Sequence, residues 1–257
     1  MKLFEIKTEI EKYPYEIRKL IEDTRTFDSS SSPEAKVLFI DKDGGYFLKT
    51  AKKGQLFKEA ELGKYFHKKG LAPEVLLYAS YKEDFLLTKK ARGLDATSQT
   101  YLDEPKRLAE KMGEVLRELH SMDFSDCPEK NRMESYFRLM EENYRLDRFD
   151  LGFGDFKTKD EAYEAAKTGY EILKPEALIH GDFCLPNMLF DNWRFSSFID
   201  LGGGGVGDRH IDIFWGAWTL KFNLKTDSYK DIFFSSYGKE KIEKDALLAV
   251  SAIEIFG

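Results

Sequence analysis

The sequence predicts an α+β protein with two lobes, a small strand-rich N-terminal lobe and a larger, mainly helical C-terminal lobe. Short strand-like runs separated by turns dominate the first 90 residues, whereas apolar residues at helical spacing dominate the remainder. We therefore expect lobes of residues 1–90 and 91–257, with residues 89–93 as the hinge. A chain of 257 residues is long enough to bury a substantial core.

The N-terminal lobe is expected to contain a hairpin. Lys36–Ile40 and Gly45–Lys49 are strand-like runs, and the acidic-glycine turn Asp41–Gly44 joins them. The pattern becomes helical over residues 56–69, and two shorter strand-like runs follow at Glu74–Tyr78 and Phe85–Thr88. The small, polar segment Ser29–Pro33 precedes the hairpin and is typical either of a flexible loop or of a loop over phosphates.

The C-terminal lobe is expected to be helical around a second hairpin. From Pro105 to Met122 the apolar residues recur at intervals of three and four, which predicts an amphipathic helix. Residues 158–173 predict another helix, whose apolar face consists of Tyr163, Ala166, Tyr170 and Leu173. The hairpin comprises residues 188–190 and 195–199, and the chain is expected to be largely helical from there to Phe256.

Composition excludes several classes of protein. Hydrophobic content of 42% with 33% charged residues is typical of a soluble globular protein, and the net charge of -6 disfavours a nucleic-acid partner. Cys127 and Cys184 have no metal-ligand spacing, which disfavours a disulfide framework or a zinc site and fits a reducing cytoplasm. No secretory signal and no apolar run of roughly 18–20 residues is present, so we expect a cytoplasmic protein without a membrane partner.

The segment HGDFCLPN, residues 180–187, holds the residues that indicate chemistry. Asp182 and Asn187 lie five positions apart, and Asp200-Leu201-Gly202 follows the second hairpin. This D-x-x-x-x-N…D-x-G order repeats the protein-kinase pattern, with Gly181 where a kinase has arginine. In such a site one Asp accepts the proton of the attacking hydroxyl, and the Asn and second Asp hold magnesium ions that bridge the phosphates.

The first lobe supplies the complementary candidates. Lys49 ends the second strand-like run and is placed to reach nucleotide phosphates, and Glu59 on the following helix is placed to pair with it. Each residue alone is most often a solvated surface residue, and an Asp or Asn in a turn most often serves the turn. The ordered combination therefore favours phosphoryl transfer over an irregular turn.

Four segments resemble the aminoglycoside phosphotransferases, in particular the kanamycin/neomycin kinase branch. They are LIHGDFCLPNMLFDNWRFSSFIDLGGGGVGDRHIDI at 178–213, residues 119–128, residues 38–49 and the closing residues 254–256. The resemblance spans nearly the whole chain. It implies a protein-kinase-like fold and magnesium-dependent transfer of the γ-phosphate of ATP or GTP to a hydroxyl of a cationic aminosugar antibiotic, an antibiotic-resistance activity.

The resemblance also implies residue roles. It makes Asp182 the general base, with His180 as structural support. Asn187 and Asp200 would bind magnesium, and Lys49 would bind the nucleotide phosphates with Glu59 as its partner. Ser32 would lie in the loop over the phosphates. Phe47 would stack on the base, and the backbone from Lys89 to Ala91 would meet the adenine edge.

The acceptor side departs from the family pattern. Family members line this cleft with carboxylates, and this chain keeps Glu254 but has Ile253 beside it and ends on Gly257. Gly203 stands where relatives have arginine, within a run of four glycines that indicates either a mobile loop or a close approach of substrate to backbone. On the helix after Asp212, Trp218 stands where relatives have a second arginine and Phe222-Asn223 where they have acids.

Other acceptor candidates have two interpretations each. Asp147, Asp150 and Asp155 precede the predicted helix at 158–173 and form either a solvated loop or an acidic wall for the acceptor. Trp215 and Trp218 are three apart on a helix and are more typical of a core than of a sugar platform. Two other functions stay open: a kinase of this fold for another antibiotic or a choline-like amino alcohol, and a nucleotide-binding module without catalysis.

Overall fold

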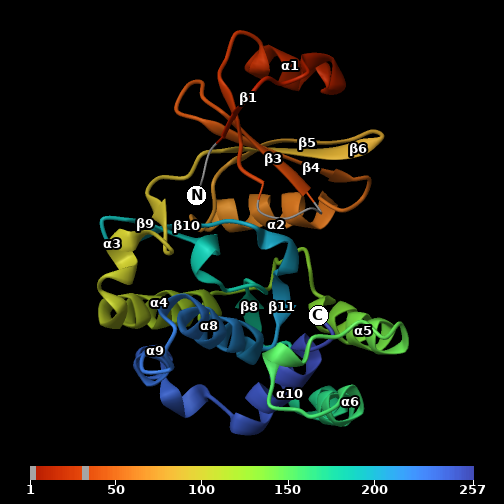
Figure 1. Cartoon of the computed structure of the whole chain (residues 1–257), viewed down its shortest axis with the longest axis vertical. Helices are drawn as coiled ribbons and strands as arrows, with labels where there is room; N and C mark the ends of the chain where they lie inside the picture. Colours follow the sequence, from red (N-terminus) through yellow and green to blue (C-terminus); the bar gives the residue numbers. More distant parts are fainter. Residues whose placement is uncertain (1–3, 31–34) are drawn as a thin grey trace. The chain divides into compact units, whose positions relative to one another are not determined.

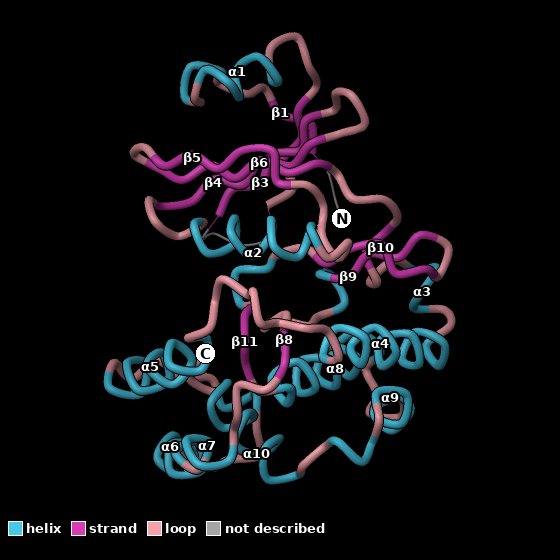
Figure 2. Tube along the Cα trace, turned by 180° about the vertical axis from the view of Figure 1, so that it is seen from behind, coloured by secondary structure: helices cyan, strands magenta, loops and turns pink. Residues whose placement is uncertain are grey.

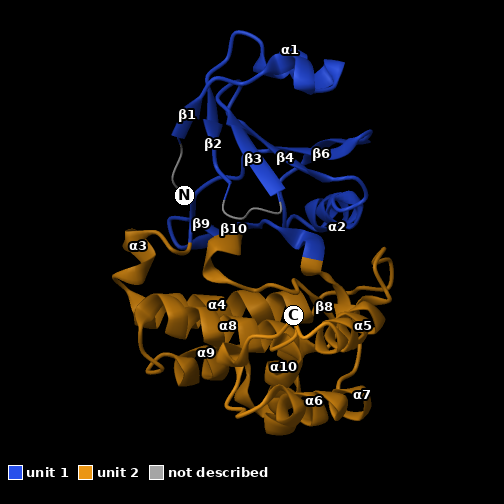
Figure 3. Ribbon diagram, turned by 45° about the vertical axis from the view of Figure 1, so that its right-hand side comes forward, with its two compact units in different colours: residues 1–95, 189–202 blue, residues 96–188, 203–257 orange. Residues whose placement is uncertain are grey.

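The computed structural model describes residues 4–30 and 35–257, which form two compact units. The first unit consists of the chain up to Asp95 together with Leu189–Gly202 (Figure 3). The second consists of Ala96–Met188 and Gly203–Gly257. The first unit therefore extends past the boundary at residue 90 and takes in the second hairpin, and the segment 89–93 lies within it.

An antiparallel six-stranded sheet forms the body of the first unit (Figures 1 and 2). Its strand order is β1-β2-β3-β4-β6-β5. Its strands are β1 (Phe4–Ile6), β2 (Thr26–Asp28), β3 (Ala35–Ile40), β4 (Tyr46–Lys52), β5 (Val75–Ser80) and β6 (Glu83–Lys89). The predicted hairpin is β3–β4, and β4 lies centrally because its other edge pairs with β6.

Two helices cover opposite faces of this sheet. Ile17 and Ile21 of α1 (Tyr15–Ile21) pack with Leu48 on one face, whereas Ala60 of α2 (Phe57–Lys68) packs with Ala51 on the other. Successive side chains of a strand point to opposite faces, so Lys49 shares the α2 face with Ala51. The alternation of β4 thus aims the lysine at the helix that carries Glu59.

The second hairpin forms a small sheet of its own in the first unit. Its strands are β9 (Met188–Asp191) and β10 (Arg194–Phe198), and β9 also pairs with β7 (Leu94–Asp95) to give the order β10-β9-β7. Gly93, with φ of +87°, makes this pairing possible, because a Cβ there would lie 2.1 Å from the carbonyl oxygen of Phe190.

Helices dominate the second unit, as the sequence predicts. They are α3 (Gln99–Leu102), α4 (Pro105–His120), α5 (Arg132–Arg145), α6 (Lys159–Lys167), α7 (Gly169–Ile172), α8 (Arg209–Leu224), α9 (Lys230–Tyr237) and α10 (Lys244–Glu254). A two-stranded antiparallel sheet of β8 (Ala177–Ile179) and β11 (Gly205–Gly207) lies among them. The short 3-10 helices of the two units are η1 (Ile10–Lys12), η2 (Leu151–Phe153), η3 (Leu185–Asn187), η4 (Leu201–Gly203) and η5 (Lys239–Lys241).

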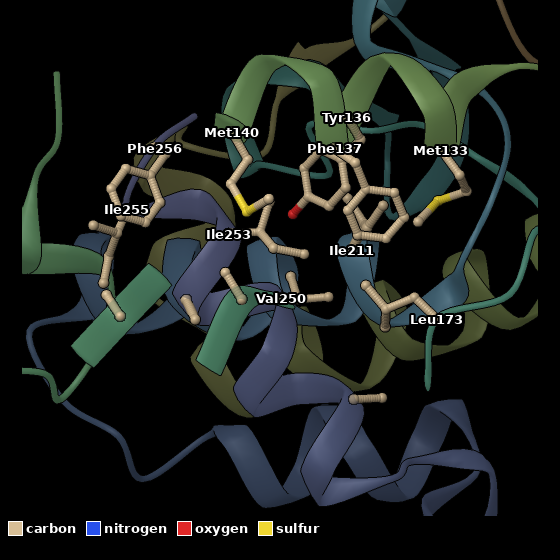
Figure 4. Close-up of a cluster of buried hydrophobic side chains, with 14 of the residues drawn as sticks. Met133, Tyr136, Phe137, Met140, Leu173, Ile211, Val250, Ile253, Ile255 and Phe256 are labelled. Atoms are coloured by element: carbon tan, nitrogen blue, oxygen red, sulfur yellow. The ribbon is translucent and has the colours of Figure 1, made fainter. Parts of the chain in front are cut away.

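The core of the second unit gathers around α10. Val250 and Ile253 of α10 pack with Tyr136 and Met140 of α5 (Figure 4). Ile253 is 1% exposed and is a core residue, so the position where relatives have an acidic residue is filled here by a packed apolar side chain. None of the helices in the described residues combines the length and the apolar character needed to cross a membrane.

The predicted helix at 158–173 is two helices, α6 and α7. Gly169 begins α7 and lies against Ile253, where a Cβ would be 3.0 Å from Ile253 Cδ1, so close packing accompanies the break. The predicted apolar face is partly wrong. Ala162 and Ala166 are fully buried, but Tyr170 is half-exposed and stacks on Phe137.

Candidate active site

In the first unit, Lys49 holds two carboxylates together. Its Nζ donates to Glu59 Oε2 and to Asp200 Oδ1, each at 2.7 Å. Lys49 comes from β4, Glu59 from the first turn of α2, and Asp200 from the segment after β10. The structure therefore brings together three of the residues that the sequence predicts for phosphate and metal binding, across 151 positions in the chain.

The protonation of this cluster follows from burial and charge. Burial disfavours the ammonium form of Lys49, but the neighbouring carboxylates Glu59 and Asp200 outweigh it and raise the pKa of Lys49. Burial raises the pKa of Glu59, Lys49 opposes that shift, and Asp200 adds to it. Lys49 is accordingly a fixed positive charge at neutral pH, as a group that binds phosphates requires.

The backbone at Asp200 adopts a conformation that non-glycine residues rarely occupy. Its φ is +60°, in the left-handed region. Asp tolerates this region better than most residues, yet the conformation still costs roughly 1 kcal/mol. Such strain is often retained where a side chain must be aimed, and here it aims the Asp200 carboxylate at Lys49.

In the second unit, Asp212 fixes the start of the HGDFCLPN loop. Its fully buried carboxylate accepts from the backbone N–H groups of His180 and Gly181, both at 2.7 Å, and contacts His120 Nε2 at 3.2 Å. His120 Nδ1 in turn lies 2.9 Å from the hydroxyl of Tyr237. Ionic hydrogen bonds to a buried carboxylate are strong, so the backbone leading into Asp182 is rigid.

Two backbones touch beside Asp182. Gly181 has φ of +81°, and a Cβ there would lie 1.9 Å from the carbonyl oxygen of Gly203. This contact explains a glycine where protein kinases have arginine. The glycine run itself packs on the chain, since Val206 N donates to Glu129 O and a Cβ on Gly205 would meet the Glu129 side chain at 2.6 Å. Close packing therefore accounts for the glycine at position 205.

Asn187 orients Asp182. The Asn187 Nδ2 donates to Asp182 Oδ2 at 2.8 Å and to the Asp182 carbonyl at 3.0 Å. Thr219 of α8 supports the same loop by accepting from Leu185 N at 3.2 Å. One oxygen of the Asp182 carboxylate is thus held by a neutral donor, and no ammonium or guanidinium lies within ion-pairing distance of it in the described residues. Asn187 therefore sets the orientation of the Asp182 carboxylate.

Asn187 in the second unit and Asp200 in the first unit each offer an oxygen that suits magnesium. Because Asn187 donates through its nitrogen, its amide oxygen points away from those bonds and is a hard ligand; Asp200 has a second oxygen besides the one on Lys49. Magnesium prefers such oxygen ligands and takes one or two protein groups, leaving the rest to phosphates and water. The described residues contain no cluster of three or more His, Cys, Asp or Glu side chains suited to a metal held by protein alone.

Glu254 lies buried at the end of α10. Its Oε1 accepts from the Tyr136 hydroxyl at 2.7 Å and from Trp215 Nε1 at 3.1 Å. Burial raises the pKa of Glu254 to about 7, against the opposing effects of Tyr136, Arg132 and Trp215 and with a small contribution from Asp182. Glu254 therefore belongs to the same electrostatic neighbourhood as Asp182.

The other predicted acceptor carboxylates are exposed. Asp150 accepts from Gly152 N with its side chain and so caps η2, and its own N–H donates to Ile255 O at 2.8 Å next to the chain end. Asp155 is exposed in the turn that follows. Asp147 forms an ion pair with Lys159.

The predicted base-binding residues lie along β4 and beyond β6. Phe47 is half-buried on β4 and packs on Phe39, with ring centroids 5.1 Å apart. Ala91 lies in the irregular segment after β6. Ser32 falls outside the described residues.

Sequence reasoning missed three residues that support the site. Asp84 is fully buried on β6 and accepts from Leu56 N just before α2. Asp212 holds the HGDFCLPN loop, and Arg132 donates to Gly203 O. A helix can be predicted at α5 from the helical spacing of its apolar residues Met133, Tyr136, Phe137 and Met140. Nothing along the chain, however, indicates which distant backbone groups the side chains of Asp84, Asp212 and Arg132 contact.

The fold and these two sets of residues define a kinase-like phosphotransferase. A model of the phosphotransferase enzyme family matches residues 23–248, and the chain belongs to this family. It is 46% identical over 259 residues to the probable aminoglycoside 3'-phosphotransferase of Lactococcus lactis subsp. lactis (strain IL1403), covering 99% of both chains. It is 30% identical over 178 residues to the aminoglycoside 3'-phosphotransferase of Niallia circulans, covering 67% of this chain and 68% of that one.

Solved structures share the fold. The crystal structure of an aminoglycoside-3'-phosphotransferase of type VIII matches with a TM-score of 0.72 at 20% identity over 96% of both chains. An aminoglycoside phosphotransferase of Streptomyces rimosus in complex with ADP and streptomycin matches with a TM-score of 0.69 at 18% identity, over 85% of this chain and 90% of that one. The two-lobed α+β prediction is confirmed, and membership of an enzyme family sets aside the non-catalytic module.

Proposed function

We propose that the enzyme transfers the γ-phosphate of ATP or GTP to a hydroxyl of an aminoglycoside antibiotic and so confers resistance. The observation that carries the proposal is the Asp182 carboxylate, oriented by Asn187 on a loop whose backbone is held by Asp212. The similarity to the Lactococcus lactis relative over almost the full length supports the acceptor class. We place the reaction in the cytoplasm, where nucleoside triphosphates are available.

The two lobes would divide the substrates. In our proposal residues 1–90 bind the nucleotide, with Lys49 on its phosphates, Glu59 holding Lys49, Phe47 stacked on the base and the backbone at Ala91 on the base edge. Residues 91–257 carry out the chemistry and bind the acceptor.

The reaction follows from the properties of these side chains. The acceptor hydroxyl oxygen forms a bond to the γ-phosphorus, the bond from that phosphorus to the β–γ bridging oxygen breaks, and the hydroxyl proton passes to Asp182. Asn187 keeps the carboxylate aimed at that hydroxyl, and Lys49 neutralises phosphate charge. Magnesium, held by Asn187 and Asp200 when bound, would neutralise the charge that develops on the departing diphosphate.

Carboxylates support a cationic acceptor. Glu254 lies in the electrostatic neighbourhood of Asp182, and Asp150 is joined to the chain end beside it. An ammonium group of the acceptor near Glu254 would lower the pKa of that carboxyl and favour its charged form. We propose Glu254, with Asp150 and Asp155 at the periphery, as the acceptor carboxylates.

A second acceptor class is favoured by an aromatic cluster on α8. Trp218 stacks on Phe222 with centroids 4.9 Å apart and an interplanar angle of 10°, and Trp215 and Phe153 complete the cluster. Phe222 is half-exposed, and Lys225 Nζ lies 4.3 Å from its centroid, so the ring already faces an ammonium. Aromatic faces bind quaternary ammonium groups, which suits a choline-like amino alcohol.

The test is a coupled measurement of ADP release with ATP or GTP and magnesium. Kanamycin, neomycin, other aminoglycosides and choline-like amino alcohols are offered in turn, and product is verified by mass. Phosphorylation of an aminoglycoside that falls by about a thousandfold or more in Asp182→Asn supports the proposal. Turnover confined to amino alcohols moves the assignment to the second class. Aminoglycoside turnover that persists in Asp182→Asn contradicts the role of Asp182.

A further inference from the structure

Arg132 of α5 reaches the glycine run that follows Asp200-Leu201. Its Nε donates to the carbonyl oxygen of Gly203 at 2.6 Å, and its guanidinium lies over the Tyr136 ring, 4.8 Å from the centroid. A hydrogen bond at one edge and a ring under one face fix a guanidinium in place. Gly203 is also the position at which the family resemblance implies an arginine. A guanidinium is therefore present at this loop, but it comes from a different helix.

The position of this guanidinium relative to Asp182 follows from backbone contacts within the second unit. The Gly203 carbonyl that accepts from Arg132 is the atom that a Cβ on Gly181 would overlap, at 1.9 Å. Gly181 is the residue before Asp182. Only the backbone of Gly203 therefore lies between the Arg132 guanidinium and the loop that carries Asp182, the proposed proton acceptor.

Arg132 forms no ion pair with a carboxylate of the described residues, although its charge lowers the pKa of the Glu254 carboxyl. Among the described residues no carboxylate lies within ion-pairing distance of it, and its hydrogen bond to Gly203 uses one N–H of several. Glu254, the carboxyl that its charge acts on, accepts its hydrogen bonds from Tyr136 and Trp215 and none from Arg132. A half-buried, oriented guanidinium that is not in an ion pair is suited to bind an anionic ligand.

We propose that Arg132 binds the phosphoryl group during its transfer, donating N–H groups to the nonbridging oxygens of the γ-phosphate. The inference rests on the proposed function, because it assigns a ligand at the same site. Charge spreads over those oxygens in the transition state, and a preformed guanidinium stabilises it without reorganisation. Arg132 would thereby replace from α5 the guanidinium that Gly203 cannot supply.

Three variants test the assignment. Arg132→Gln should lower kcat by about a hundredfold or more while the KM for the acceptor changes little, since the contact strengthens in the transition state. Arg132→Lys keeps the positive charge but lacks the planar pair of N–H donors, so its kcat should lie between those of wild type and Arg132→Gln. The double variant Arg132→Gln/Gly203→Arg returns the guanidinium to the loop and should recover part of kcat; a Cβ at Gly203 meets Gly181 O at 3.1 Å, so a small shift admits it.

A binding measurement makes the test independent of the acceptor. ADP with aluminium fluoride mimics the transferred phosphoryl group, and wild type should bind this pair more tightly than ADP alone. Arg132→Gln should lose that difference. The matched control is Arg117→Gln. Arg117 lies on α4 and also donates to a backbone carbonyl, that of Ser236, at 2.7 Å.

The outcomes separate the two levels of the proposal. If wild type turns over no aminoglycoside, the proposed acceptor is wrong, whereas the aluminium fluoride measurement still reports on Arg132. If Arg132→Gln retains kcat within about threefold of wild type, or retains the preference for ADP with aluminium fluoride, Arg132 does not bind the phosphoryl group. If Arg132→Gln loses both kcat and melting temperature, and the double variant recovers no kcat, Arg132 has a structural role instead.

Discussion

Replacing Gly181 by alanine should displace Asp182 without removing any catalytic group. The substitution has two separable effects. Gly181 has φ of +81°, where an L side chain costs roughly 1 kcal/mol. The added Cβ would also lie 1.9 Å from Gly203 O, and both partners are backbone rather than flexible side chain. The two backbones must therefore separate by at least about 1 Å to remove this overlap.

That separation sets the expected magnitude. Overpacking of this kind costs about 1–3 kcal/mol of folding free energy, in addition to the φ penalty. The larger effect is on rate, since a displacement of about 1 Å in a catalytic group can cost about a hundredfold. We expect Gly181→Ala to lower kcat by roughly that factor, which corresponds to about 2.7 kcal/mol, with little change in the KM for the nucleotide.

The assay is steady-state kinetics at fixed acceptor together with thermal unfolding. Gly70→Ala is the control, because Gly70 has a similar φ of +74° but no atom within 4 Å of an added Cβ. Gly70→Ala should lose about 1 kcal/mol of stability and keep kcat. If Gly181→Ala behaves like Gly70→Ala, with full kcat, the contact with Gly203 does not position Asp182 and the reasoning is refuted.

Three further predictions concern the supporting residues. Asp84→Ala leaves Leu56 N without its acceptor at 3.0 Å and should cost about 2–4 kcal/mol, detected as faster hydrogen exchange of the Leu56 amide; exchange at the wild-type rate would contradict this. Glu254 has its pKa raised by burial from 4.5 to about 7, so the folded state binds more protons than the unfolded state between these values. Stability should therefore fall by up to about 3 kcal/mol as pH rises through that window, and urea unfolding of Glu254→Gln should lack the slope. Lys49→Met removes the cation paired with Glu59 at 2.7 Å and should lower kcat/KM for the nucleotide by about a hundredfold, whereas an unchanged nucleotide kcat/KM would exclude Lys49 from phosphate binding.

Elements with strong local patterns were predictable from the sequence. The β3–β4 hairpin, α4 and the β9–β10 hairpin all appear, because alternation, helical spacing and turn residues are local properties. Helix α1 was missed because it is a short helix of seven residues, stabilised by packing of Ile17 and Ile21 on the sheet. The pairing of β8 with β11 depends on glycines that the sequence could not distinguish from a loop.

The candidate site was predictable in part, for a similar reason. Asp182 and Asn187 are five residues apart, so their spacing is visible along the chain, and their side chains meet at 2.8 Å. Trp218 was expected in the core, yet it stacks on the half-exposed Phe222 at one end of α8. Periodicity shows which face a residue occupies but not whether another element covers that face.

The sequence by itself indicated the chemistry, because Lys49, the HGDFCLPN loop and Asp200 occur in the order that is typical of kinase-like phosphotransferases. Only the tertiary structure decided what surrounds that chemistry. Arg132 reaches Gly203 across 71 positions, and Gly203 in turn forces a glycine at 181. Such contacts form between segments whose separation along the chain carries no periodic signal, because packing of the whole unit brings them together.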